Sequence, residues 1–332
     1  MKLLKSFATA LALAVSGLLM GSFATSAQAA YTAPYVPPGC VMVTNSGTNY
    51  PYPYKASSTS TTTGWYVYCG ADATRFQYYA GKNFVDLPNG VNTSFMRDKF
   101  QNYGFTLYVF TSAAQAQSLL GANAIPAITQ TPGVGGITQP VISPATTPFI
   151  AIWEQVVPVG GGNPAEYASN YDFLEVESHE TGHGVDTIAT TAGSGSTTQN
   201  SFRPRMSTDI SIFNAKNGCA LSGPDSTLWN TWGARKSTIC DGLGNKKPAY
   251  ASMTNLQIVN SFYTADGWTR NFQDSPDYRE VWAQLVAIQR VAGNTGPTFA
   301  ELDAWMKKIY VCSKLYTDQI YGFFTTPTVT CP

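Results

Sequence analysis

The stretch Ser178-His179-Glu180-Thr181-Gly182-His183-Gly184-Val185-Asp186 contains both histidines of the 332-residue chain, spaced as His-Glu-x-x-His. Residues four apart share one face of a helix, so the two imidazoles can bind the same metal ion. Glu180 lies about 100° round the helix from His179, and from there it can take a proton from a water at that metal. The pattern predicts a Zn²⁺ site with His179 and His183 as ligands and Glu180 as general base.

Acidic residues are concentrated around this motif, although the chain is poor in charge. Only 12% of its residues are charged, yet five of its 20 acidic residues lie between Asp172 and Asp186. A pattern as short as His-Glu-x-x-His also arises by chance on surface helices that bind no metal. The helical pattern here, the absence of other histidines and the signs of export described below favour the metal site.

A catalytic zinc ion normally has three protein ligands and one open position. With no further histidine, the third ligand must be a carboxylate, and Asp186 is the nearest beyond the motif. Helix rise places it about 7 to 8 Å along the axis from a metal held between the two histidines, at about 1.5 Å per residue. An aspartate cannot span that distance, so we expect Asp186 to be an outer partner of the site, with a salt bridge to the body of the protein as the alternative.

Two glutamates remain beyond Asp186, namely Glu280 and Glu301. Glu301 closes the capping box Thr298-Phe299-Ala300-Glu301. Glu280 begins an apolar-faced helix, and a glutamate there needs a partner if it is buried. That partner is either the metal or an arginine, Arg279 or Arg290. An N-terminal cap at Asp277, with Glu280 three residues later, would also explain the residue. We favour Glu280 as the third ligand.

The N-terminal 29 residues have the features of a secretory signal peptide. Lys2 and Lys5 precede an apolar run from Phe7 to Phe23, and Ala27-Gln28-Ala29 offers a cleavage site. No later segment has the roughly 18 to 20 apolar residues that a membrane span needs. We expect a secreted protein, extracellular or periplasmic if a second membrane is present.

Six cysteines lie beyond the signal, an even number that suits disulfides in an exported protein. Six allow 15 connectivities, and sequence proximity favours Cys40–Cys69, Cys219–Cys240 and Cys312–Cys331. Removal of the signal takes two lysines, so 20 − 2 = 18 basic residues face 20 acidic ones. This balance argues against nucleic acid or an anionic membrane as the main partner.

The chain divides into an arm and a catalytic region after the signal. Residues 30–91 are rich in Pro, Tyr, Ser and Thr, and we expect a disulfide-tethered arm on the surface. In residues 92–332, helices are expected at 92–103 and 112–120 and strands at 104–110 and 147–153. The motif helix begins near Asn170, and the last third is helical at 253–262, 277–291 and, in one or two pieces, 298–320. Residues 201–250 give few periodic signals and are expected to form a disulfide-stapled insertion.

The motif resembles the zincin metallopeptidases of the gluzincin type. Locally, His179-Glu180-Thr181-Gly182-His183-Gly184-Val185-Asp186 is most similar to the anthrax-lethal-factor-like and Pro-Pro endopeptidase group. In that group the third ligand is a glutamate that opens a helix, and Glu280-Val281-Trp282-Ala283 is similar. The resemblance implies an α+β, zincin-like fold with a small mixed sheet, an active-site helix and a mostly helical C-terminal lobe.

Two departures from that group are present. The interval from His183 to Glu280 is about twice as long as in such compact domains, so the insertion would be looped out. The group's oxyanion-stabilising tyrosine, seven positions before the glutamate, is Gln273 here. Tyr263 is the expected substitute, whereas Tyr278 would point away from the site.

The sequence therefore predicts a secreted zinc endopeptidase that acts on protein or peptide substrates, with the strand at 149–153 as an edge that aligns the substrate. The alternative is a secreted binding or adhesion protein on a zincin scaffold without turnover.

Overall fold

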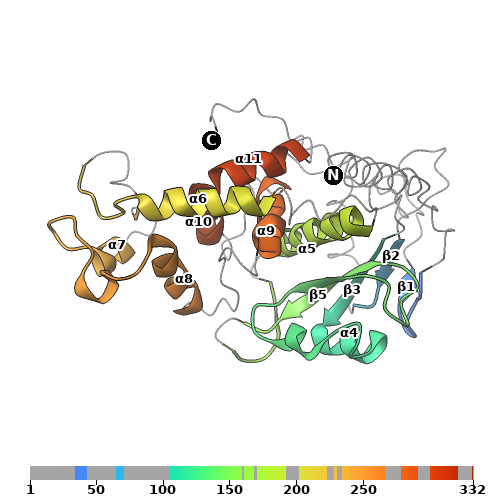
Figure 1. The fold of residues 1–332 in the computed structure, drawn as a ribbon. Coiled ribbons are helices and arrows are strands. Elements are labelled where there is room, and N and C mark those ends of the chain that lie inside the picture. The colour runs from blue at the N-terminus through green and yellow to red at the C-terminus, as the bar shows by residue number, and fades with distance from the viewer. Residues whose placement is uncertain are drawn as a thin grey trace, which may run out of the picture.

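The computed structural model describes residues 34–42, 65–70, 105–158, 161–167, 170–191, 202–222, 228–229, 234–265, 278–290, 300–320 and 331. The expected signal peptide, most of the arm and the helix predicted at 92–103 lie outside these residues. The described part is an α+β structure in which a small mixed sheet lies on one side and most of the helices on the other (Figure 1).

The sheet is built from six short strands in the described residues: β1 (Val41–Met42), β2 (Trp65–Tyr68), β3 (Thr106–Ser112), β4 (Gly136–Gln139), β5 (Phe149–Val156) and β6 (Ala165–Glu166). Its order is β1-β2-β3-β5-β4, with β6 paired to the far end of β5. Strands β2, β3 and β5 are parallel to one another, whereas β4 runs antiparallel to β5. The strands predicted at 104–110 and 147–153 correspond to β3 and β5.

Strand β5 lies inside the sheet, so the expectation that it forms the substrate edge is wrong. It pairs with β3 on one side and with β4 on the other. Large apolar side chains such as those of Ile150, Ile152 and Trp153 are buried on both faces of a central strand, which explains its composition. The edge on this side is β4, a short strand that begins at Gly136 and that the sequence analysis did not predict.

The two faces of the sheet carry different apolar clusters because successive side chains alternate. Tyr108 and Phe110 pack towards α4 (Ala113–Leu120), and Leu107 and Val109 pack towards the helical side. Helix α4 begins where predicted, since the Ser112 side chain accepts a hydrogen bond from the backbone N–H of Gln115.

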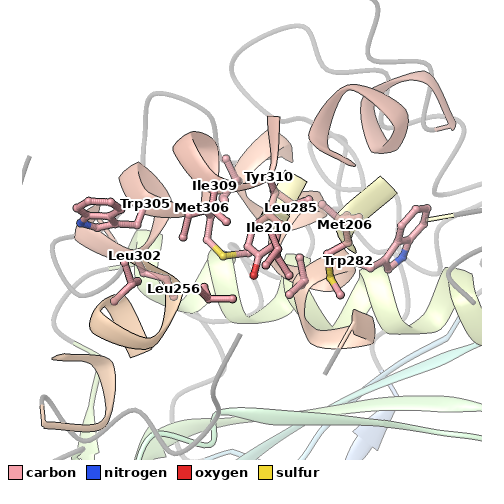
Figure 2. Packing of buried hydrophobic residues seen from close by; sticks show 14 of the residues in the cluster. Met206, Ile210, Leu256, Trp282, Leu285, Leu302, Trp305, Met306, Ile309 and Tyr310 are labelled. Carbon is pink, nitrogen blue, oxygen red and sulfur yellow. The ribbon is translucent and has the colours of Figure 1, made fainter. Parts of the chain in front are cut away.

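The other described helices begin on the face of the sheet opposite α4, and α7 (Ala234–Ile239) and α8 (Asn255–Ala265) lie beside the sheet (Figure 1). In chain order, these other helices are α5 (Asn170–Thr191), α6 (Arg203–Ala215), α7 (Ala234–Ile239), α8 (Asn255–Ala265), α9 (Tyr278–Arg290), α10 (Ala300–Ile309) and α11 (Val311–Ile320), with short 3-10 turns at Ala127–Gln130 and Pro248–Tyr250. Of the one or two pieces expected at 298–320, the structure has two, which meet at Tyr310. Figure 2 shows how side chains from α6, α8, α9 and α10 converge in the core between these helices.

The prediction of a looped-out insertion at 201–250 needs correction in its first part, because α6 belongs to the core. Met206, Ile210 and Phe213 are buried at i, i+4 and i+7. Asp209 is also buried, and its carboxylate accepts hydrogen bonds from the backbone N–H groups of Cys312 and Ser313 at the start of α11. Serine, threonine and arginine around these positions conceal the apolar stripe in the sequence.

Three disulfides fasten the chain, and they are the three that sequence proximity favours. Cys40 is bonded to Cys69, Cys219 to Cys240, and Cys312 to Cys331. The first ties β1 to the end of β2, and the second closes the region that precedes α8. Among the described residues, no helix has both the length and the apolar character needed to cross a bilayer.

Candidate metal centre

Helices α5 and α9 meet closely at Gly182. A Cβ atom placed on Gly182 would lie 2.8 Å from the Cα of Ala283 in α9, closer than side-chain carbons approach backbone atoms. The indole N–H of Trp282 also donates a hydrogen bond to the Gly182 carbonyl oxygen, over 3.2 Å. The glycine inside the motif therefore allows a helix to approach, and α5 continues past it to Thr191.

We expect Gly182→Ala to destabilise the protein even though alanine is the better helix former. The propensity gain is about 1 kcal/mol, whereas overpacking against backbone typically costs about 1–3 kcal/mol. Urea unfolding of the metal-free protein should show the loss, and zinc affinity should fall with it because α9 carries Glu280. Gly242→Ala is the matched control, since nothing lies within 4 Å of its added Cβ. Equal stability of both variants would contradict the close crossing.

The crossing brings together the three side chains that the sequence singles out. The Nε2 of His179 lies 3.2 Å from one Glu280 carboxylate oxygen, and the Nε2 of His183 lies 3.5 Å from the other. The two Nε2 atoms are 3.2 Å apart. His179, His183 and Glu280 are the group of described residues whose ligand atoms all lie close enough together to hold a metal ion, within 4.8 Å of one another.

These separations fit a tetrahedral zinc site. With zinc-to-ligand distances of about 2.0–2.1 Å, the ligand atoms of a tetrahedron are about 3.3 Å apart. The two imidazole nitrogens are 3.2 Å apart, and each lies 3.2 or 3.5 Å from a different oxygen of the Glu280 carboxylate. The three side chains are 15–19% exposed, so a fourth position can be reached by water or a substrate.

The two imidazoles favour the ionised form of the Glu280 carboxyl group. Burial alone would raise the pKa of its carboxyl group, but attraction to His183 and His179 outweighs burial and holds the pKa well below its ordinary value. Glu280 is therefore an anion that faces two histidine nitrogens. The alternative pairing with Arg279 is not what the described contacts show, because Arg279 lies 3.5 Å from Asp186 instead.

Glu180 is held beside this group by the edge strand. The Thr138 hydroxyl on β4 lies 2.9 Å from a Glu180 carboxylate oxygen and 2.7 Å from the Glu180 backbone oxygen. A Cβ on Gly136 would lie 2.8 Å from the Cγ of Glu180, so this glycine allows strand and helix to approach. Glu180 is 7% exposed and is not one of the three clustered residues, as its angle on the helix predicts.

The remaining predicted residues are placed as follows. Asp186 forms a salt bridge with Arg279, and this pair joins α5 to α9. A salt bridge was the alternative that the sequence left open for Asp186. Tyr278 packs against the helical core, with the Arg203 guanidinium 5.5 Å from the centre of its ring. Tyr263 belongs to α8, but its side chain lies outside the described part, as does Gln273.

Sequence reasoning missed three residues near the site, namely Thr138, Tyr167 and Gln284. The Tyr167 hydroxyl donates a hydrogen bond to the Gly135 carbonyl oxygen over 3.4 Å, and burial, then the Glu180 and Asp172 carboxylates, raise its pKa. Gln284 contacts His179 from α9. A signal for Gln284 was present, because it lies one helical turn after Glu280.

Comparison of the chain with protein-family models, curated protein sequences and solved structures finds no match. What the chain does must therefore be inferred from the chemistry of its own side chains.

Proposed function

We propose that this protein is a zinc-dependent endopeptidase with a zincin-like active site. The observation that carries the proposal is the group of His179, His183 and Glu280, whose ligand atoms, one from each residue, all lie within 4.8 Å of one another. Two neutral imidazoles and one carboxylate are a common donor set for catalytic zinc. The order in the sequence, with Glu180 inside the histidine pair, is that of zinc peptidases.

Zinc bound by these residues would polarise the scissile carbonyl and increase the acidity of a water molecule. Glu180 would take the proton from the attacking water and pass it to the leaving amine. The Thr138 hydroxyl shares its one hydrogen between the backbone oxygen and one carboxylate oxygen of Glu180. The other carboxylate oxygen would accept the proton from water. Tyr263 remains our candidate for stabilising the oxyanion.

The substrate would lie along β4 in an extended conformation. In the order of the described strands, β4 is at the end of the sheet, and it pairs with β5 by one edge. Its other edge can form backbone hydrogen bonds with a peptide, a common mode of recognition. Because Thr138 of the same strand contacts Glu180, a peptide held there would be next to the general base.

We also propose that the protein acts outside the cytoplasm. The three disulfides suit an oxidising compartment. The apolar segment after Lys2 and Lys5 would be the signal that directs export.

Metal removal tests the proposed function. We expect the purified protein to contain one zinc ion per chain by elemental analysis and to cleave internal bonds in a diverse peptide library, as mass spectrometry would show. A chelator should abolish cleavage, and stoichiometric Zn²⁺ should restore it. Stoichiometric zinc without any cleaved peptide would overturn the peptidase proposal and favour the binding or adhesion protein.

A further inference from the structure

Gln284 connects the candidate zinc site to the buried interior of the helical layer. Its side-chain nitrogen lies 2.6 Å from a Glu175 carboxyl oxygen and 3.0 Å from an Asp303 carboxyl oxygen. An amide nitrogen carries two hydrogens, and these two contacts use both of them. The amide oxygen of Gln284 therefore faces His179, whose Nδ1 is 3.0 Å away.

This orientation determines which nitrogen of His179 carries the proton. Since an amide oxygen can only accept, the Nδ1 of His179 must donate. In the neutral ring, the Nε2 then has a free lone pair, and it is this atom that lies 3.2 Å from both Glu280 and His183. The lone pair is directed to the place where a metal would be bound.

Gln284 is itself held in place by two buried carboxyl groups from different helices. Glu175 lies in α5, one turn before His179, and Asp303 lies in α10; they are 0% and 2% exposed. Burial and the adjacent Asp303 carboxylate raise the pKa of Glu175 well above its ordinary value. The amide of Gln284, which extends from α9, is thus held by one carboxyl group from α5 and one from α10.

We propose that Gln284 is a positioning residue that holds His179 in its Nδ1-protonated tautomer and orients the ring for metal binding, with Glu175 and Asp303 as its anchor. The inference rests on the proposed zinc site. Metal-binding histidines usually donate their second N–H to a carboxylate or a carbonyl group. Here the neutral amide of Gln284 has that role. The carboxyl groups of Glu175 and Asp303 contact this amide and not the histidine.

Gln284→Leu tests this role because leucine can neither accept from His179 nor donate to the carboxyl groups. In the metal-free protein, ¹⁵N NMR of the imidazole should show the Nδ1-protonated tautomer of His179 in the wild type and a mixture of tautomers in the variant. Zinc affinity, measured by competition with a chelating dye, should fall about 10- to 100-fold. Gln289→Leu in the same helix is the matched control, because Gln289 bonds to Lys314 instead.

A second set of variants distinguishes this role from simple misfolding of Gln284→Leu. Gln284→Glu adds a third carboxyl group to the anchor and should weaken zinc binding. The double variant Gln284→Glu/Glu175→Gln restores one amide and two carboxyl groups, and it should recover both the tautomer and most of the affinity. An unchanged tautomer and affinity in Gln284→Leu, or no recovery in the double variant, would overturn the inference. Because the tautomer is measured without metal, this outcome is independent of whether the wild type cleaves peptides.

Discussion

Glu180→Gln is expected to retain zinc and to lose peptide hydrolysis. Glutamine has nearly the same shape, and its amide oxygen can still accept the hydrogen bond from the Thr138 hydroxyl that holds Glu180. It cannot take a proton from water, and general-base catalysis contributes roughly 10²- to 10⁴-fold to rates. We expect kcat/KM on a cleaved peptide to fall by that factor, with the zinc content of the purified variant unchanged.

Glu301→Gln is a suitable control for this experiment. Glu301 is 43% exposed, lies in α10 and pairs with Arg235, so its loss of charge should leave hydrolysis unaffected. If Glu180→Gln kept the wild-type rate with zinc bound, Glu180 would not be the base. If it lost zinc as well as activity, its carboxylate would belong to the ligand set, in conflict with its position beside the cluster.

The site could be predicted from the sequence where chemistry limits the choices. Two histidines four apart on a helix can bind one metal, and only a few carboxylates could complete the set. Helix rise argues against Asp186, and Glu280 is favoured over its alternatives, an N-terminal cap or an arginine pair, because a buried glutamate needs a partner. The structure brings Glu280 to the two histidines and pairs Asp186 with Arg279.

The missed features depend on contacts between segments distant in the sequence. Thr138 looks like an ordinary residue of a short polar strand until β4 is laid against α5, where its hydroxyl reaches Glu180. The need for Gly182 comes from a backbone atom of Ala283, one hundred residues later. Neither residue has a local pattern, because the space available to a side chain is decided by the partner element.

The strand pattern shows a related limit. The aromatic and β-branched run at 149–153 correctly predicted a strand, but composition alone did not give its place in the sheet. A strand between two others is rich in large apolar residues because both of its faces are covered. The edge strand β4 (Gly136–Gln139) is short and half polar, as edge strands often are.

Glu280→Gln is expected to have the largest effect on metal binding. The carboxylate lies within 3.2 to 3.5 Å of both imidazole nitrogens, and its charge opposes that of a zinc ion. Glutamine removes this charge, and its uncharged amide oxygen is a weaker ligand for zinc than a carboxylate. Since loss of an outer partner already costs about 10- to 100-fold in metal affinity, loss of this ligand should cost more than about 100-fold. Competition with a chelating dye would measure the change.

The fold should survive this substitution, because the neutral amide avoids the cost of burying a carboxylate. Circular dichroism of the metal-free variant should match that of the wild type, and hydrolysis should be absent at stoichiometric zinc. Asp186→Asn provides the comparison: it removes a salt bridge to a half-exposed Arg279 and should change zinc affinity far less. The reverse order, with Asp186→Asn losing zinc and Glu280→Gln keeping it, would mean that α5 supplies the third ligand itself and that the approach of α9 serves packing alone.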